Sequence, residues 1–262
     1  MSDLKFMLAK DYVKGKDSVK GWLLSEKFDG YRSCYCPKEK QFYSRQNKLF
    51  HAPEWFLDAM PSMLMDGELW IGRNMFQEMG AVRKKIPLDE DWINITFQVY
   101  DAPNIDGTFY ERLLELKKSV ELMNEKWKIR RKKYPYPINT LDCPLVFVSQ
   151  VVINNDSQLD RLYKEIIQNE GEGVMLKDPN SHYEGKRSKY LLKYKPCFDE
   201  EAIIIDYKKG QGKYKGLLGG FICKPLINHD TYMSIDEDED HIFSISGMDD
   251  DVRKSYQKTH PI

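Results

Sequence analysis

Lys27 stands in a short stretch whose side chains could carry out nucleophilic chemistry on a phosphate. The stretch reads K-F-D-G-Y-R from Lys27 to Arg32, so an amine, a carboxylate and a guanidinium are close neighbours in the chain. A lysine amine can attack phosphorus, while nearby charges position and neutralise the phosphate. A solvated hairpin tip would have the same residues, because Asp-Gly turns that carry a lysine are common. The assignment therefore depends on what the other segments add.

The residues on either side of Lys27 predict two β-strands joined by a turn. The apolar residues 22–24 precede the lysine, and residues 31–35 alternate in the manner of a strand. Asp29-Gly30 supplies turn chemistry between them. In this interpretation a hairpin holds Lys27 at the end of a strand.

Two glutamates stand beside predicted strands. Residues 64–71 predict a strand whose period of two places Asp66, Glu68 and Trp70 on one face. If this strand is buried, Glu68 needs a partner or a ligand, whereas an edge strand would leave it in water. Glu172 comes just before a second predicted strand and is a second candidate carboxylate.

An aromatic ring and two lysines complete the set of candidate side chains. The strand predicted at 95–101 has one wholly apolar face, which leaves Tyr100 on the face available to a ligand. Around 191–196, Lys193 and Lys195 point in the same direction along a predicted strand. Two cations on one face either bind an anion or face water.

The remaining pattern predicts helices and further strands. Thr108 and Glu111 form a capping-box sequence before a helix at 109–130, and a second helix is predicted at 157–169. The basic run at 130–133 is either a solvated helix end or a DNA contact. A short helix is expected after Pro53, and short strands are expected at 41–45, 145–151, 202–207, 219–223 and 241–245.

The bulk composition narrows the class of protein. The chain has 262 residues and a formal net charge of -1, but basic stretches at 126–133 and 208–215 remain compatible with nucleic acid. Its five cysteines include no C-x-x-C pair, which argues against a disulfide framework or a zinc site and favours a reducing compartment. The sequence shows neither a membrane-spanning apolar run nor a signal-peptide pattern. We therefore expect an intracellular protein without a membrane partner.

Taken in chain order, these segments resemble the covalent nucleotidyltransferase superfamily, and most closely the small viral-type ATP-dependent DNA ligases. The resemblance extends from about residue 22 to 260 and rests on the segments 27–32, 44–45, 66–69, 100–101, 172–177 and 191–195. Six spaced motifs in one order rarely arise by chance. The resemblance implies an α+β fold: a catalytic adenylyltransferase domain at 1–196, with antiparallel sheets and flanking helices, followed by a small OB-type β-barrel domain at 197–262.

The resemblance also assigns roles to matching positions. Lys27 is expected to take AMP from ATP through a phosphoramidate bond, and Asp29 to matter most once AMP has passed to DNA. Glu68 is expected to contact the ribose, and Tyr100 to stack on adenine. Glu172, together with Glu68, is expected to bind a Mg²⁺ or Mn²⁺ ion. The side chains expected to contact phosphates are Lys193, Lys195, Arg32, Arg45 and Arg187.

The implied activity is the sealing of nicks in duplex DNA by a monomeric enzyme, with roles in DNA replication, repair and recombination. The basic loop at 208–216 is expected to contact backbone phosphates. The chain departs from the pattern of these ligases because it stops at Ile262, where they usually continue. We therefore expect the barrel to be incomplete at its C-terminus and self-adenylylation to be affected more than the sealing of an adenylylated nick.

Three alternatives remain at this point. An RNA ligase or an mRNA-capping guanylyltransferase would share the lysine motif. A nick-binding module without catalysis would share the overall pattern. An unrelated α+β domain would carry these motifs by chance.

Overall fold

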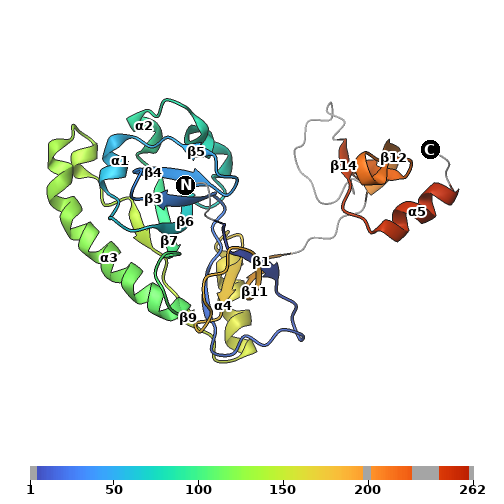
Figure 1. The fold of residues 1–262 in the computed structure, drawn as a ribbon, viewed down its shortest axis with the longest axis horizontal. Coiled ribbons are helices and arrows are strands. Elements are labelled where there is room, and N and C mark those ends of the chain that lie inside the picture. Colours follow the sequence, from blue (N-terminus) through green and yellow to red (C-terminus); the bar gives the residue numbers. More distant parts are fainter. Residues whose placement is uncertain (1–4, 197–201, 226–241, 260–262) are drawn as a thin grey trace. The chain divides into compact units, whose positions relative to one another are not determined.

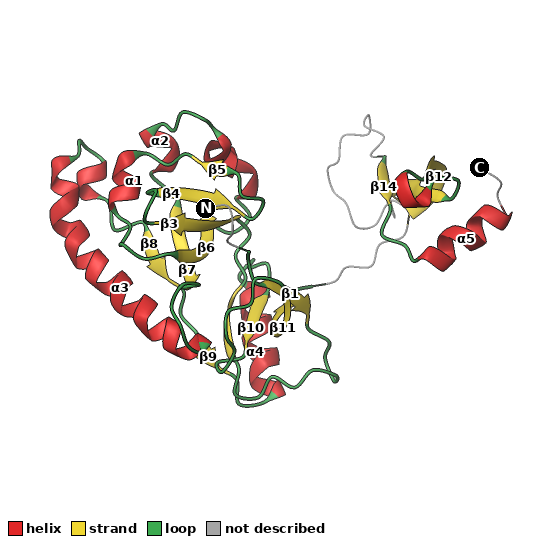
Figure 2. Cartoon of the chain, in the orientation of Figure 1, coloured by secondary structure: helices red, strands yellow, loops and turns green. Residues whose placement is uncertain are grey.

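The structure is a computed structural model that describes residues 5–196, 202–225 and 242–259. The chain divides into two compact units, residues 1–196 and residues 197–262. Most elements of both units are labelled in Figure 1, and the elements are coloured by type in Figure 2. None of the described helices is long and apolar enough to cross a membrane.

The first unit contains two β-sheets. The five-stranded sheet has the order β1-β11-β10-β2-β9, and its strands are β1 (Leu8–Asp11), β11 (Arg187–Tyr194), β10 (Val174–Lys177), β2 (Leu23–Glu26) and β9 (Val151–Val152). The six-stranded sheet has the order β5-β4-β3-β6-β7-β8, and its strands are β5 (Leu49–Phe50), β4 (Gln41–Ser44), β3 (Tyr31–Cys36), β6 (Met65–Trp70), β7 (Thr96–Asp101) and β8 (Leu145–Phe147). The pairs β1·β11 and β7·β8 are parallel, and the other pairs are antiparallel.

The helices cover the two sheets separately. The long helix α3 (Phe109–Arg130) packs against β7 and β8, and α4 (Asp156–Gln168) packs beside the five-stranded sheet (Figure 2). Both helices confirm the prediction, and the Thr108–Glu111 capping box is present. The shorter helical elements are α1 (Glu54–Asp58), α2 (Asp89–Trp92) and the 3₁₀ segments Phe76–Arg83, Arg131–Lys133 and Ile138–Thr140.

Each sheet has its own hydrophobic core. The six-stranded sheet and its helices bury a large cluster that includes Trp55, Phe97 and Trp127. The five-stranded sheet and α4 bury a smaller cluster that includes Leu159 and Leu192. A fully buried side chain of this size contributes about 1.5–3 kcal/mol, so each cluster stabilises its own sheet and helices. The first unit is therefore built of two sheets with largely separate cores.

The predicted Lys27 hairpin is wrong. The strand β2 pairs with β10 and β9, whereas β3 pairs with β4 and β6, so the two strands lie in different sheets. The local sequence predicts both strands correctly but carries no signal for their partners, which come from distant segments. Residues 27–30 are consequently a connection between the two sheets.

Of the other strand predictions, some are confirmed and some are wrong. The strands expected at 41–45, 64–71 and 95–101 are confirmed as β4, β6 and β7. β6 lies between β3 and β7, so the edge-strand alternative for Glu68 is wrong. The single strand predicted at 145–151 is two strands in different sheets, β8 and β9, and β1 was not predicted.

The basic run after α3 makes contacts within the protein. Arg130 Nη1 donates to Asp58 O at 2.9 Å, and Lys133 Nζ donates to Asp58 Oδ2 at 2.5 Å. Arg131 Nη1 donates to Thr140 O at 3.0 Å. These contacts fix the end of the helix and favour a structural role for the run over a DNA contact.

The second unit contains a three-stranded antiparallel sheet of β12 (Ala202–Lys209), β13 (Leu218–Pro225) and β14 (Phe243–Ile245). It also contains the 3₁₀ turn Gly212–Tyr214 and the helix α5 (Asp250–Thr259), which was not predicted. The three strands are present where they were expected, but the described part of this unit forms no closed barrel. The sequence has a run of five acidic residues at 236–240 and ends in the segment His260-Pro261-Ile262, and both lie outside the described residues.

Candidate active site

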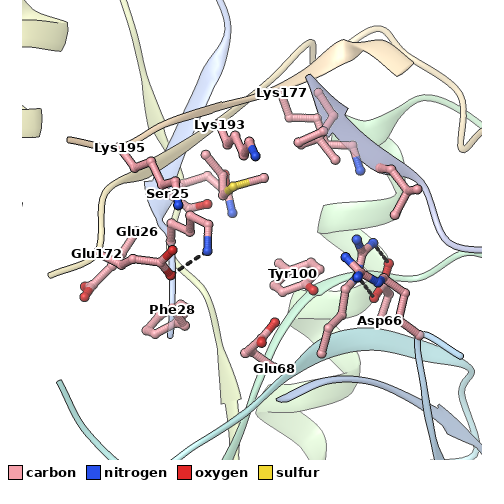
Figure 3. A pocket seen from close by; sticks show the side chains of 18 of the residues that line it. Ser25, Glu26, Phe28, Asp66, Glu68, Tyr100, Glu172, Lys177, Lys193 and Lys195 are labelled. Atoms are coloured by element: carbon pink, nitrogen blue, oxygen red, sulfur yellow. Dashed lines mark hydrogen bonds and ion pairs between the residues drawn. The ribbon is translucent and has the colours of Figure 1, made fainter. Parts of the chain in front are cut away.

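A cleft of about 340 Å³ in the first unit is lined by residues from both sheets (Figure 3). The predicted residues that line it are Lys27, Arg32, Arg45, Glu68, Tyr100, Glu172, Arg187, Lys193 and Lys195. They come from segments spread from residue 27 to residue 195. The fold thus gathers nine of the ten predicted side chains into one cavity.

Lys27 lies at the point where the chain leaves the five-stranded sheet. Its backbone nitrogen donates to Gly173 O at 2.9 Å, which extends the pairing between β2 and β10 by one residue. Its Nζ donates to Glu172 Oε2 at 2.5 Å, and each of the two side chains is 25% exposed. The amine is therefore held in the cleft beside a carboxylate and remains accessible to a ligand.

The register of the five-stranded sheet brings Lys193 to the same face. Ser25, Met175 and Lys193 are aligned across β2, β10 and β11, and all three line the cleft. Lys193 Nζ lies 3.2 Å from Asp11 Oδ1, and Lys195 follows just beyond the end of β11. The two lysines therefore face the cavity, as Figure 3 shows, and supply positive charge on the side of Lys27.

Arg32 is held on the opposite wall by a buried aspartate. Its Nε and Nη2 donate to Asp66 at 3.1 and 2.7 Å, and the Asp66 side chain is only 1% exposed. Asp66 also accepts a hydrogen bond from Tyr183 at 2.9 Å. A bidentate pair of this kind fixes the plane of the guanidinium. Asp66 and Tyr183 were not among the predicted site residues, although Asp66 lies on the same predicted strand face as Glu68.

Glu68 and Tyr100 form the part of the wall beside Arg32. The backbone register places Glu68 opposite Arg32 on β3. Burial raises the pKa of Glu68 to about 8, and the charges of Arg32 and Lys27 oppose this shift. Tyr100 presents its ring to the cleft, and its hydroxyl donates to Gly67 O at 3.3 Å. An aromatic face beside a carboxyl group suits a ligand that combines a flat ring with hydroxyl groups.

The sequence interpretation missed Lys177, which also lines the cleft. Its Nζ forms an ion pair with Asp101 at the end of β7, and Arg112 of α3 donates to the same carboxylate at 2.7 and 3.1 Å. Burial lowers the pKa of Lys177, and the Asp101 charge opposes that effect. In the sequence, the only sign that Lys177 belongs to the site was its position at the end of the segment 172–177.

Asp29 is the predicted residue that the larger cleft does not include. It is exposed and lines a neighbouring pocket of about 130 Å³ together with Lys27, Glu172 and Arg73. Lys27 and Glu172 thus border both cavities. Asp29 therefore borders Lys27 in a cavity that Lys193 and Lys195 do not line.

Glu68 and Glu172 fit a magnesium ion better than they fit a transition metal. No group of three or more His, Cys, Asp or Glu side chains suited to a metal exists within the described ranges. Magnesium is commonly held by one or two carboxylates together with water and phosphate oxygens of a substrate. Glu68 and Glu172 both line the cleft and provide this donor set.

Sequence comparison finds known proteins that are similar to this chain. A family model described as "ATP dependent DNA ligase domain" matches residues 6–195. A DNA ligase of Haemophilus influenzae is 30% identical over 206 residues, which cover 79% of this chain and 69% of that protein. A DNA ligase of Methanopyrus kandleri is 24% identical and matches over only 28% of its own length.

Structural comparison agrees with the sequence. A structure from a study of Lig E DNA ligases has a TM-score of 0.75 and 26% identity, covering 96% of this chain and 87% of that one. The Chlorella virus DNA ligase-adenylate has a TM-score of 0.56 and 20% identity, covering 97% and 89%, and it shows the fold alone. The mixed arrangement of sheets and helices is that of these ligases.

Proposed function

The chain belongs to the family of ATP-dependent DNA ligase domains, and we propose that it seals nicks in duplex DNA through a lysyl-AMP intermediate. The observation that carries the proposal is the contact between Lys27 Nζ and Glu172 Oε2 in a cleft that is also lined by Lys193 and Lys195. A nucleophile, a carboxylate and two cations converge there, as transfer of a nucleotide to an amine requires.

In the first step, the neutral Lys27 amine attacks the α-phosphorus of ATP. A nitrogen–phosphorus bond forms, the bond from that phosphorus to the pyrophosphate oxygen breaks, and the nitrogen loses a proton. Glu172 accepts a hydrogen bond from Nζ and is placed to take this proton. Lys193 and Lys195 lie on the same side and neutralise phosphate charge as it develops.

The opposite wall of the cleft binds the nucleoside. The Tyr100 ring stacks on adenine, and Glu68 contacts the ribose hydroxyls. Arg32, fixed by its bidentate pair with Asp66, presents its guanidinium in one orientation. Because these groups are positioned before the ligand arrives, little reorganisation is needed at the moment of transfer.

The second and third steps take place on DNA. AMP passes from Lys27 to the 5'-phosphate of a nick: the nitrogen–phosphorus bond breaks and an oxygen–phosphorus bond forms. The 3'-hydroxyl then attacks the 5'-phosphorus, displaces AMP and leaves a phosphodiester. Arg45 and Arg187, which line the cleft, contact phosphates, and Asp29 acts after AMP has left Lys27.

A divalent ion is part of this proposal. Glu172 and Glu68 would hold Mg²⁺, with Mn²⁺ as a substitute, and the ion would neutralise negative charge on the phosphates. The protein's own contribution is to keep both carboxylates in the cleft. Arg32 and Lys27 oppose the burial that favours the protonated form of Glu68.

For the second unit we propose a small OB-type β-barrel that binds DNA without sequence preference. The loop at 208–216 carries Lys213 and Tyr214, and the Lys213 ammonium lies 4.4 Å from the Tyr214 ring centroid. Arg253 of α5 lies 4.2 Å from the same centroid and donates to Leu218 O at 2.6 Å. Because Arg253 holds this loop in place, its lysines are suited to contact backbone phosphates of DNA. We propose that the protein acts as a monomer in replication, repair or recombination.

Covalent labelling tests the proposal. We expect α-labelled ATP with Mg²⁺ to label the protein, EDTA to prevent labelling, and Lys27→Ala to abolish it. The same preparations should seal nicked duplex DNA, and wild type and Lys27→Ala should both seal a nick that is already adenylylated.

Each other outcome identifies a different function. Stronger labelling with GTP would indicate a capping guanylyltransferase, and a preference for nicked RNA would indicate an RNA ligase. Binding to nicked DNA without any labelling or sealing would indicate a non-catalytic nick-binding module. Any of these results would contradict the proposed function.

A further inference from the structure

We propose that Arg73 is a positioning residue that holds together the three segments carrying Lys27, Glu172 and Glu68. The inference rests on the proposed function. Arg73 lies in the turn that follows β6, the strand of the six-stranded sheet that carries Glu68. Its side chain, however, bonds to Glu26 at the end of β2 in the five-stranded sheet and to Asn169 at the end of α4, which packs on that sheet. No sequence motif pointed to it.

The first of these bonds is a bidentate ion pair with Glu26, the residue before Lys27. Arg73 Nε donates to Glu26 Oε1, and Nη2 donates to Oε2, both at 2.8 Å. The Arg73 side chain is 35% exposed and the Glu26 side chain 19%. Two parallel hydrogen bonds fix orientation as well as distance, so the pair holds the turn after β6 in one orientation against the end of β2.

The second bond reaches the segment that carries Glu172. Arg73 Nη1 donates to Asn169 O at 2.8 Å, at the C-terminal end of α4. From there the chain turns through Glu170, whose φ of 65° is in the left-handed region, to Gly171. A Cβ at Gly171 would lie 3.2 Å from Glu26 Oε1, so this turn packs against the carboxylate that Arg73 holds. One guanidinium therefore fixes both sides of the Lys27–Glu172 contact.

A ring contact joins the same segments independently. The rings of Phe28 and Trp70 meet edge to face with centroids 5.1 Å apart. Phe28 follows Lys27, and Trp70 ends β6. The Lys27 connection is thus held to the six-stranded sheet on both sides of the lysine, by Glu26 and by Phe28.

The place of Arg73 argues against direct contact with AMP. Arg73 lines the smaller pocket with Lys27, Asp29 and Glu172, but it is not among the residues of the larger cleft. A lysine at this position could not reproduce its planar fork, because an ammonium cannot form the bidentate pair and the carbonyl bond in one plane. Arg73 therefore acts through the residues it holds.

The three steps of the reaction depend on this positioning to different extents. Lys27 Nζ is the nucleophile of the first step and the leaving group of the second, but in the third step the 3'-hydroxyl attacks a nick that already carries AMP. A displacement of about 1 Å can slow a reaction on the order of 100-fold. Loss of Arg73 should therefore slow self-adenylylation by that order and slow the sealing of a pre-adenylylated nick much less.

The experiment compares Arg73→Ala, Arg73→Lys and wild type in both reactions. Arg161→Ala serves as the matched control, because Arg161 forms an exposed ion pair with Glu165 on α4. We expect Arg73→Ala to lower kcat for labelling without a matching change in the KM for ATP, Arg73→Lys to fall between Arg73→Ala and wild type, and Arg161→Ala to behave as wild type.

Two results would overturn the role of Arg73. One is labelling of Arg73→Ala at the wild-type rate. The other is an equal loss of labelling and sealing in Arg73→Ala, which would show a general structural role. If wild type itself takes no label but binds nicks, the proposed function fails instead, so the two failures are distinguishable.

Discussion

Lys177 on β10 forms an ion pair with Asp101 at the end of β7, so a lysine of the five-stranded sheet meets an aspartate of the six-stranded sheet. Asp101 also accepts two hydrogen bonds from Arg112, and the side chains of Asp101 and Arg112 are 1% and 0% exposed. One buried carboxylate thus balances two cations between the sheets.

Replacing that carboxylate should destabilise the first unit strongly. Asp101→Asn leaves Arg112 and Lys177 without their shared anion, and removing one member of a buried ion pair costs about 3–5 kcal/mol. Lys177→Met should cost less, because Asp101 keeps Arg112. Urea unfolding measures both, with Lys128→Met, in an exposed pair with Glu125, as the control. Equal stability of Asp101→Asn and the control would contradict this assignment.

Stability should depend on pH through Glu68. Burial raises its pKa to about 8, whereas an unfolded glutamate titrates near 4.3. Between these values the folded protein holds a proton that the unfolded chain has lost, so the contribution of Glu68 is full below about pH 4.3 and is lost as the pH rises to about 8. The stability of Glu68→Gln relative to wild type should therefore rise across this range. Unfolding free energies measured without nucleotide test this, and a difference that does not vary with pH would refute it.

Tyr100 should contribute to nucleotide binding through its ring rather than its hydroxyl. Stacking of a base on an aromatic side chain is worth about 1–3 kcal/mol, so Tyr100→Ala should raise the KM for ATP roughly tenfold or more. Tyr100→Phe keeps the ring and loses only a long hydrogen bond of 3.3 Å, so it should remain close to wild type. Labelling rates at several ATP concentrations separate the two variants. If Tyr100→Phe were as impaired as Tyr100→Ala, the hydroxyl would carry the interaction.

Gly30 should be required because of a close approach between two strands. A Cβ at this position would lie 2.3 Å from Leu69 O, a backbone atom next to the Glu68 position. Gly30→Ala must therefore separate β3 from β6, at a cost of about 1–3 kcal/mol, and should also reduce Lys27 labelling. Gly80→Ala is the control, because nothing lies within 4 Å of a Cβ there. Thermal unfolding and labelling of both variants measure the difference, and equal behaviour would show that β3 and β6 tolerate the methyl group.

The basic loop of the second unit should govern the salt dependence of DNA binding. If Lys213 and Lys215 each neutralise one phosphate, replacing both with alanine should reduce the slope of log K against log salt by about 1.8. The double variant Lys118→Ala with Lys128→Ala, on exposed positions of α3, should leave the slope unchanged. Titration of nicked duplex DNA at several salt concentrations gives the slope. An unchanged slope in the loop variant would remove the loop from the DNA interface.

Local signals in the sequence predicted the elements well and their pairing poorly. The helix α3 was predictable because its capping box and its apolar stripe are both local. The Lys27 hairpin was wrong because the partners of β2 and β3 come from distant parts of the chain. The strand β1 was missed because it is partly exposed and has no apolar pattern of its own, and because its partner β11 lies far along the chain.

The candidate site shows the same division between local and long-range information. The residues lining the cleft were predictable where they stand in a recognisable motif, as Lys27 and Glu172 do. Arg73 and Lys177 are revealed only by contacts across the two sheets, with Glu26 and Asp101, and no spacing in the sequence signals such a contact. Asp29 belongs to a motif, but its position outside the larger cleft follows from the route of the chain between the sheets.

The parallel pairing of β1 with β11 brings Leu8 next to Arg187. A ribosome must therefore release nearly the whole first unit before the five-stranded sheet beside Lys27 can close, whereas most of the six-stranded sheet is available much earlier. Such distant pairing slows folding and leaves strand edges uncovered in the meantime. Within the first unit, the cleft around Lys27 is thus completed only after most of the six-stranded sheet is available.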